Sequence, residues 1–225
     1  MHTGVHSGHT HSHAGPQTPT TEGIVLRRAG IYNLIFSPLL KRSEKTLLNL
    51  AGVKPGSKVL DVGCGPASLT LAAKRKSGPT GEVCGVDASP QMIAEARKQA
   101  RKAHLEIDFR NAVAEKLPYE DNKFDAVVSR LVFHHLPGDL KEQALAEIYR
   151  VLKPGGTCLV DDFELDSLPG PGFFKRHVEG MHHMLRVDVA EYAPLFEASH
   201  FEGVEWGKTG HAVLSYVKGV KPSQS

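Results

Sequence analysis

Short apolar runs alternate with amphipathic stretches along most of the chain. Runs typical of strands cover residues 58–62, 82–87, 105–109, 124–128 and 157–162. Apolar residues at helical spacing lie between them, over 67–76, 89–103 and 139–152. Strands separated by helices indicate βαβ units, in which helices cover both faces of a parallel sheet.

The two ends of this region follow other patterns. Residues 24–54 are rich in apolar positions but are interrupted by Pro38, which predicts two short helices packed over the domain. A helix near 188–199 precedes two short strands, 203–206 and 212–217, joined by a glycine-containing turn, and this pattern predicts an antiparallel hairpin. We therefore predict a Rossmann-like α/β fold, a three-layer sandwich around a seven-stranded, mostly parallel sheet that ends in an antiparallel C-terminal hairpin.

The first 23 residues differ in composition from the rest. They contain five of the 13 histidines among Thr, Ser, Gly and Pro, with almost nothing able to enter a core. We predict a disordered tail over 1–23 and a single domain over 24–225, with lid helices at 24–54. Histidine tracts can bind Ni, Cu or Zn, but the irregular spacing here favours a solvated tail, and we predict no metal site.

Charge and cysteine content narrow the function classes. The chain carries 27 Lys and Arg against 25 Asp and Glu, so it lacks the basic field typical of nucleic-acid binding. Its three cysteines lie far apart, which argues against a disulfide framework or a zinc ribbon. No apolar run approaches the roughly 18 residues of a membrane span. We expect a cytoplasmic monomer or homodimer without a membrane span or a nucleic-acid partner.

A glycine turn follows the first strand, at Gly63-Cys64-Gly65. Glycines there let the backbone bend and approach a ligand at the start of the next helix. The dinucleotide fingerprint needs a third glycine, where this chain has Ser68, and Pro66 lies within the loop. Asp61, two residues before the turn, is placed to organise the loop or to meet a cationic ligand. A nucleoside ligand without a pyrophosphate therefore suits the motif better.

Asp87 ends the second strand, 22 residues after Gly65. A carboxylate at that strand end can accept both ribose hydroxyls of a nucleotide. The alternative is structural, because Asp87 or Ser89 could simply cap the helix that begins at Pro90. We favour the ribose role for Asp87.

Together these features resemble the class I S-adenosylmethionine-dependent methyltransferases, and most closely the small enzymes of the ubiquinone/menaquinone-biosynthesis type. Further matching motifs are Glu115-Lys116-Leu117-Pro118-Tyr119, Phe124-Asp125, His134-His135, Glu147 and Arg150-Val151-Leu152-Lys153-Pro154-Gly155-Gly156. The resemblance runs from about Tyr32 to Ile148 and on through the hairpin.

The resemblance implies S-adenosylmethionine as cofactor and S-adenosylhomocysteine as product. The residues it assigns to cofactor binding are Tyr32, Asp61, Gly63, Cys64, Gly65, Pro66, Asp87, Ala88, Met92, Ala112, Val113, Ala114, Ser129 and Arg130. Two positions depart from the family pattern: Ala67 replaces a common glycine, and Val113 replaces an aspartate that bonds the adenine amino group. We expect weaker cofactor binding from the second departure, which titration of Val113→Asp would test.

The resemblance also implies transfer of a methyl group to a small, fairly apolar acceptor. A base is needed only if the acceptor is protonated at neutral pH, and histidine suits that role. The candidate bases are His134, His135, His177, His182 and His183. Each has a plainer alternative, in shaping a loop or as a polar position on a helix.

The segment 164–187 covers the acceptor side in this family. Its apolar side chains are expected either to line the acceptor pocket or only to attach a helix to the core; they are Phe173, Phe174, Met181 and Met184.

Two other function classes stay open. An NAD(P)-dependent oxidoreductase would share the fold, although the broken glycine fingerprint and the C-terminal hairpin argue against it. A non-catalytic module that binds the cofactor is the second, because loss of catalysis leaves no necessary mark in the sequence. The acceptor and its methylated atom cannot be inferred from the fold.

Overall fold

The structure, a computed structural model, describes residues 30–163, 187–211 and 214–223, and the side chains from residue 40 onward within these ranges. The predicted tail at 1–23 lies outside the described residues, as does all but the last residue of the predicted acceptor-side segment 164–187. The domain boundaries drawn from the sequence stay predictions.

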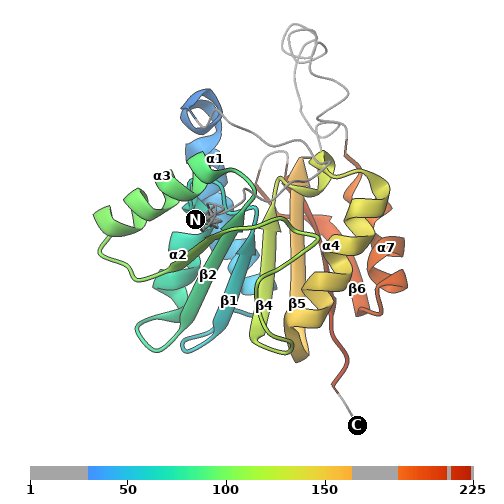
Figure 1. The fold of residues 1–225 in the computed structure, drawn as a ribbon. Coiled ribbons are helices and arrows are strands. Elements are labelled where there is room, and N and C mark those ends of the chain that lie inside the picture. Colours follow the sequence, from blue (N-terminus) through green and yellow to red (C-terminus); the bar gives the residue numbers. More distant parts are fainter. Residues whose placement is uncertain (1–29, 164–186, 212–213, 224–225) are drawn as a thin grey trace, which may run out of the picture.

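A seven-stranded sheet forms the middle layer, in the order β3-β2-β1-β4-β5-β7-β6 (Figure 1). The strands are β1 Lys58–Val62, β2 Glu82–Asp87, β3 Asp108–Asn111, β4 Phe124–Arg130, β5 Leu152–Phe163, β6 Glu202–Lys208 and β7 Leu214–Val220. The first five pair in parallel, whereas β7 runs antiparallel to both β5 and β6. The predicted fold class and its C-terminal hairpin are confirmed.

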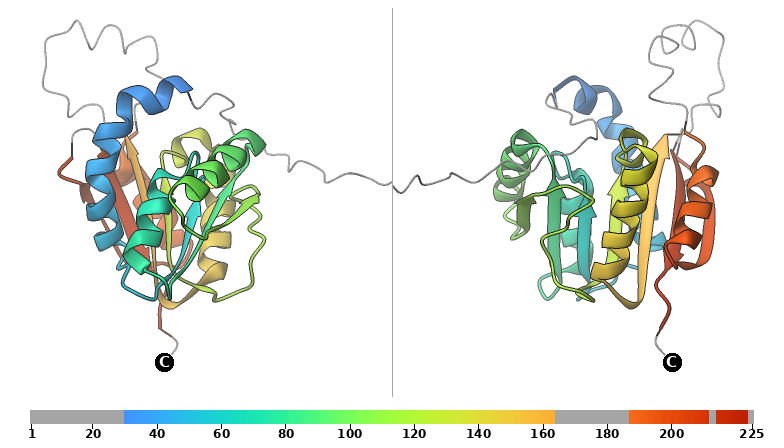
Figure 2. Two further views of the ribbon diagram at one scale, coloured as in Figure 1. Left: turned by 90° about the vertical axis from the view of Figure 1, so that its left-hand side faces the viewer. Right: turned by 45° about the vertical axis from the view of Figure 1, so that its right-hand side comes forward.

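Helices cover both faces of this sheet (Figure 2). They are α1 Gly30–Leu50, α2 Ser68–Ser77, α3 Pro90–Lys102, η1 Phe133–His135, α4 Gly138–Val151, η4 Val189–Tyr192 and α7 Ala193–Ala198. Buried side chains of α1 and α2 pack on one face, at Leu47, Leu48 and Leu69, and those of α4 and α7 pack on the other, at Leu145 and Phe196. Apolar burial on both faces supplies the main stabilisation of such a sandwich.

The direction of strand progression reverses between β1 and β4. From β1 the chain moves outward through β2 and β3, and then returns to place β4 on the other side of β1. Ligands of open α/β sheets bind at such a switch point, beyond the carboxyl ends of the strands. The carboxyl ends of β1, β2 and β4 therefore mark the place to look for a site.

Two predicted elements differ from the structure. The expectation of two short helices around Pro38 is wrong, because one helix, α1, runs through that position. A proline within a helix removes one backbone hydrogen bond and bends the helix rather than always ending it, and the ribbon of α1 changes direction along its length (Figure 2). The third strand lies at Asp108–Asn111 instead of 105–109.

The strand β6 forms one edge of the sheet. Its Trp206 is the large apolar side chain most exposed among the described residues, at 53%. Within the ranges that the structure describes, no helix has the length and apolar character needed to cross a membrane. No group of three or more His, Cys, Asp or Glu side chains there is arranged to hold a metal ion.

Candidate cofactor site and a histidine pair

The glycine turn leaves β1 and bends directly toward β2. The backbone N–H groups of Gly63 and Cys64 both donate to the carbonyl of Val86, each at 2.8 Å. Gly63 has φ +72, and a Cβ built there would lie 2.2 Å from Cγ2 of Val132, so only glycine fits. A Cβ built at Gly65, which has φ +50, would have no neighbouring atom within 4 Å. The loop is closely packed at Gly63 and open at Gly65.

The carboxylate of Asp87 fixes this loop to the end of β2. One oxygen accepts the N–H of Gly65 at 2.9 Å, and the other accepts the N–H of Ser89 at 2.8 Å. The cap of α3 is Ser89, whose hydroxyl accepts the N–H of Met92 at 3.4 Å, so Asp87 does not cap that helix. A carboxylate has about four acceptor positions, which leaves Asp87, half-buried, able to accept two further bonds.

A second carboxylate, that of Asp61, lies beneath the loop. It is 1% exposed and accepts the hydroxyl of Thr70 at 2.6 Å. Burial raises the pKa of Asp61 to about 7; Thr70 and Arg130 act against that rise, while the neighbouring Asp161 and Asp87 add to it. A nearby cation would favour the ionised form of this group.

Arg130, at the end of β4, joins this region to α1. Its guanidinium donates to Asp161 at 3.1 Å, to the carbonyl of Leu40 at 3.2 Å and to the hydroxyl of Ser43 at 2.9 Å. Its side chain is only 9% exposed. Arg130 is thus held by protein groups, and its role in the described structure is to anchor α1 over the carboxyl edge of the sheet.

A carboxylate from α1 was missed by the sequence reasoning. Glu44 is half-buried and accepts the hydroxyl of Ser68, the first residue of α2. Burial raises its pKa, whereas Ser68 and Arg130 lower it. Asp61, Asp87, Asp161 and this glutamate therefore lie around the loop, where they outnumber the basic side chains that act on them, which are Arg130, Lys41 and Arg75.

The remaining predicted cofactor residues occupy two kinds of position. Ala112, Val113, Ala114 and Met92 are at most 9% exposed and follow β3 or begin α3. Ser129 is buried behind the loop, where its hydroxyl donates to the carbonyl of Val62 at 2.9 Å. Tyr32 lies in α1, and its side chain is outside the described residues. The structure thus brings Asp61, the glycine turn and Asp87 together, and places Ser129 in a structural contact.

The backbone conformation at Ala67 explains why glycine is common at this position in the family. Ala67 adopts φ +74, a left-handed conformation that glycine reaches without strain. Its methyl group is fully buried beside Ile93 and Phe109. At the start of α2, the strained backbone of Ala67 is unfavourable, and the burial of its methyl group offsets part of that cost.

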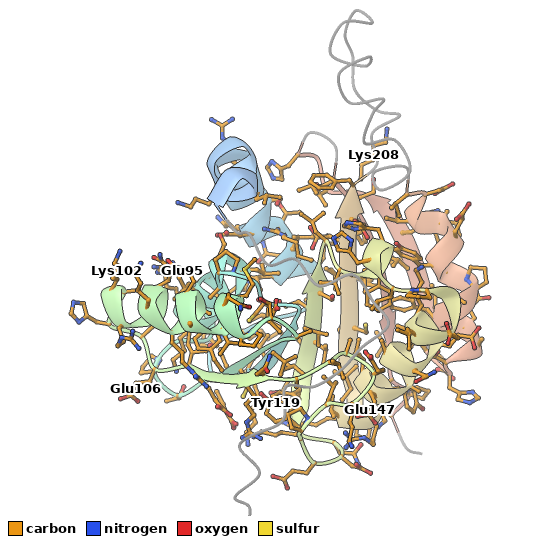
Figure 3. The ribbon with its side chains drawn as sticks, turned by 45° about the horizontal axis from the view of Figure 1, so that its top comes forward. Glu95, Lys102, Glu106, Tyr119, Glu147 and Lys208 are labelled. Carbon is orange, nitrogen blue, oxygen red and sulfur yellow. The ribbon has the colours of Figure 1, made fainter. Side chains whose placement is uncertain are left out.

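Arg150 holds the loop 115–121, which follows residues 112–114. Its guanidinium donates to the carbonyls of Leu117 and Tyr119 at 3.0 and 2.7 Å and to the carboxylate of Glu147. Glu147 in turn accepts the N–H of Leu117 at 2.8 Å, and Tyr119 and Glu147 lie at the same side of the molecule (Figure 3). Glu147 and Arg150 of the sequence motif thus fix the loop 115–121.

We expect Arg150→Met to lower the free energy of unfolding by about 1–2 kcal/mol, because the loop carbonyls lose a charged donor while water can partly replace it. Urea denaturation followed by circular dichroism measures this change. Lys98→Met is the matched control, since Lys98 is 54% exposed and pairs with Glu95 on the helix surface; it should change stability by less than about 0.5 kcal/mol. Equal effects of both variants would contradict the role of Arg150.

Two of the five candidate histidines fall within the described residues. His134 and His135 form η1, just after β4, with ring centroids 3.8 Å apart. Nδ1 of His134 lies 2.7 Å from the carboxylate of Asp162 at the end of β5. Burial, together with the neighbouring His134, lowers the pKa of His135 to about 4, while Asp162 acts against that fall. His177, His182 and His183 lie outside the described residues, as do Phe173, Phe174, Met181 and Met184.

Comparison with known proteins agrees with this geometry. A family model described as a methyltransferase domain matches residues 59–156. A demethylmenaquinone methyltransferase from Bacillus cytotoxicus is 38% identical over 120 residues, which are 53% of this chain and 50% of that protein. The chain therefore spans about half the length of the curated relatives it matches.

Solved structures share the fold at low sequence identity. A putative S-adenosylmethionine-dependent methyltransferase from Methanococcus maripaludis superposes with a TM-score of 0.69 and 22% identity, covering 87% of this chain and 90% of that one. The 4+2 cyclase SpnF superposes with a TM-score of 0.66 and 21% identity, covering 90% of this chain and all of the other. The resemblance inferred from the sequence motifs is confirmed: residues 59–156 match the methyltransferase-domain model, and the whole described fold is shared with solved methyltransferase structures.

Proposed function

We propose that this chain catalyses methyl transfer from S-adenosylmethionine to a small, fairly apolar acceptor. The observation that carries the proposal is the glycine loop held to Asp87, with an open position at Gly65 and carboxylates around it. When bound, S-adenosylmethionine supplies a methyl group on a positively charged sulfur. Placing an acceptor in line with that methyl group is then the main task of the protein.

The charge of the site favours this cofactor over a dinucleotide. Asp61, Asp87 and Glu44 lie around the loop, and Arg130 is already engaged by Asp161 and α1. The pyrophosphate of NAD(P) would bring negative charge to this negative region, whereas a sulfonium and an ammonium group bring positive charge. The carboxyl groups around the loop therefore disfavour an NAD(P)-dependent oxidoreductase.

The position of each residue around the loop suggests which part of the cofactor it would contact. Asp87 would accept the ribose hydroxyls, and the apolar residues Met92, Ala112 and Val113 would enclose the adenine. Asp61 and the turn at Gly63–Gly65 would lie next to the methionine end, with Tyr32 close to its carboxylate. Val113 offers adenine no carboxylate, so we expect only backbone and apolar contacts there.

The acceptor class is proposed from the curated relatives. These relatives are demethylmenaquinone methyltransferases, and their similarity covers about half of this chain. A fairly apolar aromatic acceptor also agrees with the phenylalanines and methionines predicted to line the acceptor side. The cyclase SpnF has the same fold and is named for a different reaction, so the fold alone does not distinguish methyl transfer from other functions.

A methyl-transfer assay tests the proposal. The full chain is incubated with S-adenosylmethionine labelled on its methyl group and with reduced demethylmenaquinone, catechol, aniline or thiophenol. We expect label to enter at least one acceptor. Tight cofactor binding with no transfer to any acceptor would favour the non-catalytic module.

The affinity for S-adenosylmethionine should depend on pH through Asp61. Because burial raises the pKa of Asp61 to about 7, the carboxyl is largely protonated at pH 6 and largely ionised at pH 8. A cationic ligand prefers the ionised form, so we expect binding to tighten about three- to tenfold over this range. Titration calorimetry at both pH values measures the change.

Asp61→Asn is the control for this prediction. An amide keeps the shape and can still accept the hydroxyl of Thr70, but it does not ionise. The variant should lose most of the pH dependence that the wild type shows. A wild-type affinity that is equal at pH 6 and pH 8 would contradict the role of Asp61.

A further inference from the structure

The carboxylate of Asp162 is the centre of a buried network at the end of β5. Asp162 is fully buried, and its oxygens accept Nδ1–H of His134 at 2.7 Å and the backbone N–H of the same residue at 3.2 Å. They also accept the backbone N–H of Phe163 at 2.9 Å and the hydroxyl of Tyr192 at 3.2 Å. Three elements, η1, β5 and η4, thus meet at one side chain.

This network determines which nitrogen of His134 carries the proton. An ionised carboxylate only accepts hydrogen bonds, so Nδ1 must be the protonated nitrogen when the ring is neutral. Nε2 then keeps its lone pair. The second contact, through the backbone N–H of His134, fixes the ring relative to β5.

Tyr192 completes the orientation from the other side. Burial and the Asp162 carboxylate raise the pKa of Tyr192, so its hydroxyl stays protonated and acts as a donor. Its ring packs against Phe133, with centroids 5.8 Å apart. Tyr192 therefore holds Asp162 in place without competing for the proton of His134.

The network lies next to the glycine loop. Val132, two residues before His134, is the side chain that a Cβ at Gly63 would strike at 2.2 Å. The side chain of His134 is 4% exposed, which keeps it apart from bulk water. The loop that would hold the cofactor and the turn that carries His134 are thus in direct contact.

His135 is less suited to accept a proton. Its Nδ1 is buried and has no hydrogen-bond partner among the described residues. Burial lowers its pKa to about 4, which makes it a weak base at neutral pH. The two adjacent histidines therefore differ in what they can do.

We propose that His134 is the base that deprotonates the methyl acceptor, and that Asp162 and Tyr192 are the positioning residues that orient it. This inference rests on the proposed methyl transfer. As the bond between the acceptor atom and the methyl carbon forms and the carbon–sulfur bond breaks, Nε2 of His134 takes the acceptor's proton. The electron pair of the broken bond stays on sulfur, Asp162 stabilises the imidazolium, and the proton later passes to solvent.

The tautomer of His134 can be measured without an acceptor. Long-range ¹⁵N–¹H NMR of the ¹⁵N-labelled full chain should show His134 protonated on Nδ1 in the wild type. In Asp162→Asn the amide can donate as well as accept, so we expect a shift toward protonation on Nε2. Protonation of wild-type His134 on Nε2 would overturn the inference.

The second test measures activity with reduced demethylmenaquinone or catechol, whichever is methylated faster, because the hydroxyl groups of both are protonated at neutral pH and need a base. We expect His134→Gln to lower kcat about 100- to 10,000-fold and Asp162→Asn about 10- to 100-fold, each with an S-adenosylhomocysteine affinity within about twofold of the wild type. Tyr192→Phe should lower kcat by less than tenfold.

His200→Asn is the matched control. His200 is exposed and has φ +67, a conformation that asparagine tolerates, so full activity is expected. If the wild type and His134→Gln transfer methyl equally well, the inference fails and the proposed function stands. If the wild type transfers methyl to none of the four probes, the proposed function fails first, and the inference fails with it.

Discussion

Asp87→Ala is expected to weaken binding of S-adenosylhomocysteine about 100- to 1,000-fold, the equivalent of losing two charge-assisted hydrogen bonds to the ribose. The variant also frees the N–H groups of Gly65 and Ser89, which the carboxylate now holds at 2.9 and 2.8 Å. Both losses act at the loop that meets the ligand. Titration calorimetry of the two proteins measures the difference.

The control for this prediction is Asp108→Ala. Asp108 begins β3, its side chain is 45% exposed, and it pairs with Arg110, away from the carboxyl edge of the sheet. Its removal should leave the affinity within about twofold, since exposed pairs contribute little. If Asp87→Ala binds S-adenosylhomocysteine as tightly as the control does, Asp87 has no role in ribose binding.

Gly63→Ala is expected to lower the free energy of unfolding by about 3 kcal/mol, from overpacking together with a left-handed backbone that disfavours alanine. The physical reason is the contact of 2.2 Å between the new Cβ and Val132. The double variant Gly63→Ala/Val132→Ala should recover part of this loss, because it removes the clash and keeps only the backbone strain. Chemical denaturation of the three proteins provides the values.

Gly65→Ala separates stability from binding at the same loop. A Cβ at Gly65 meets no atom within 4 Å, so only the strain of φ +50 remains, at about 1 kcal/mol. The added methyl group would nevertheless occupy the space open to a ligand, and we expect affinity for S-adenosylhomocysteine to fall more than tenfold. If Gly65→Ala destabilises the protein as much as Gly63→Ala does, the loop is not packed as the structure shows.

Much of the fold follows from local patterns. The apolar runs at β1, β2 and β4 are buried on both faces of the sheet, and such runs remain visible in the sequence. The start of α3 carries two signals in the sequence, a capping serine at Ser89 and a proline in the first turn at Pro90. The continuity of α1 through Pro38 was not predicted, because a proline signals a local break, whereas the packing that holds Leu47 and Leu48 in the core is tertiary.

The candidate site was only partly predictable for a related reason. Asp61, Gly63 and Asp87 belong to one contiguous motif and one strand end, and their spacing carries a signal. Asp162 was not predicted as a site residue, although it ends the predicted strand 157–162 and the rule that carboxyl ends of parallel strands meet at one edge gave a signal for it. Glu44 and Tyr192 come from helices far along the chain, and only tertiary packing brings them to Ser68 and Asp162.

The assignment of Ser129 and Arg130 to the cofactor stays a prediction, although both side chains already have protein partners. Both lie at the end of β4, the correct edge of the sheet. In the structure the Ser129 hydroxyl donates to Val62, and Arg130 is engaged by Asp161 and α1. Position along a strand indicates the neighbourhood of a site, whereas hydrogen-bond partners decide what a side chain does there.

The loop region between β1 and α2 is expected to bind a cationic nucleoside without a pyrophosphate. Titration calorimetry of the full chain with S-adenosylmethionine, S-adenosylhomocysteine and NAD tests it most directly. We predict saturable binding of the first two ligands, weakened by Asp87→Ala, and no measurable heat with NAD. Binding of NAD without binding of S-adenosylmethionine would contradict the account.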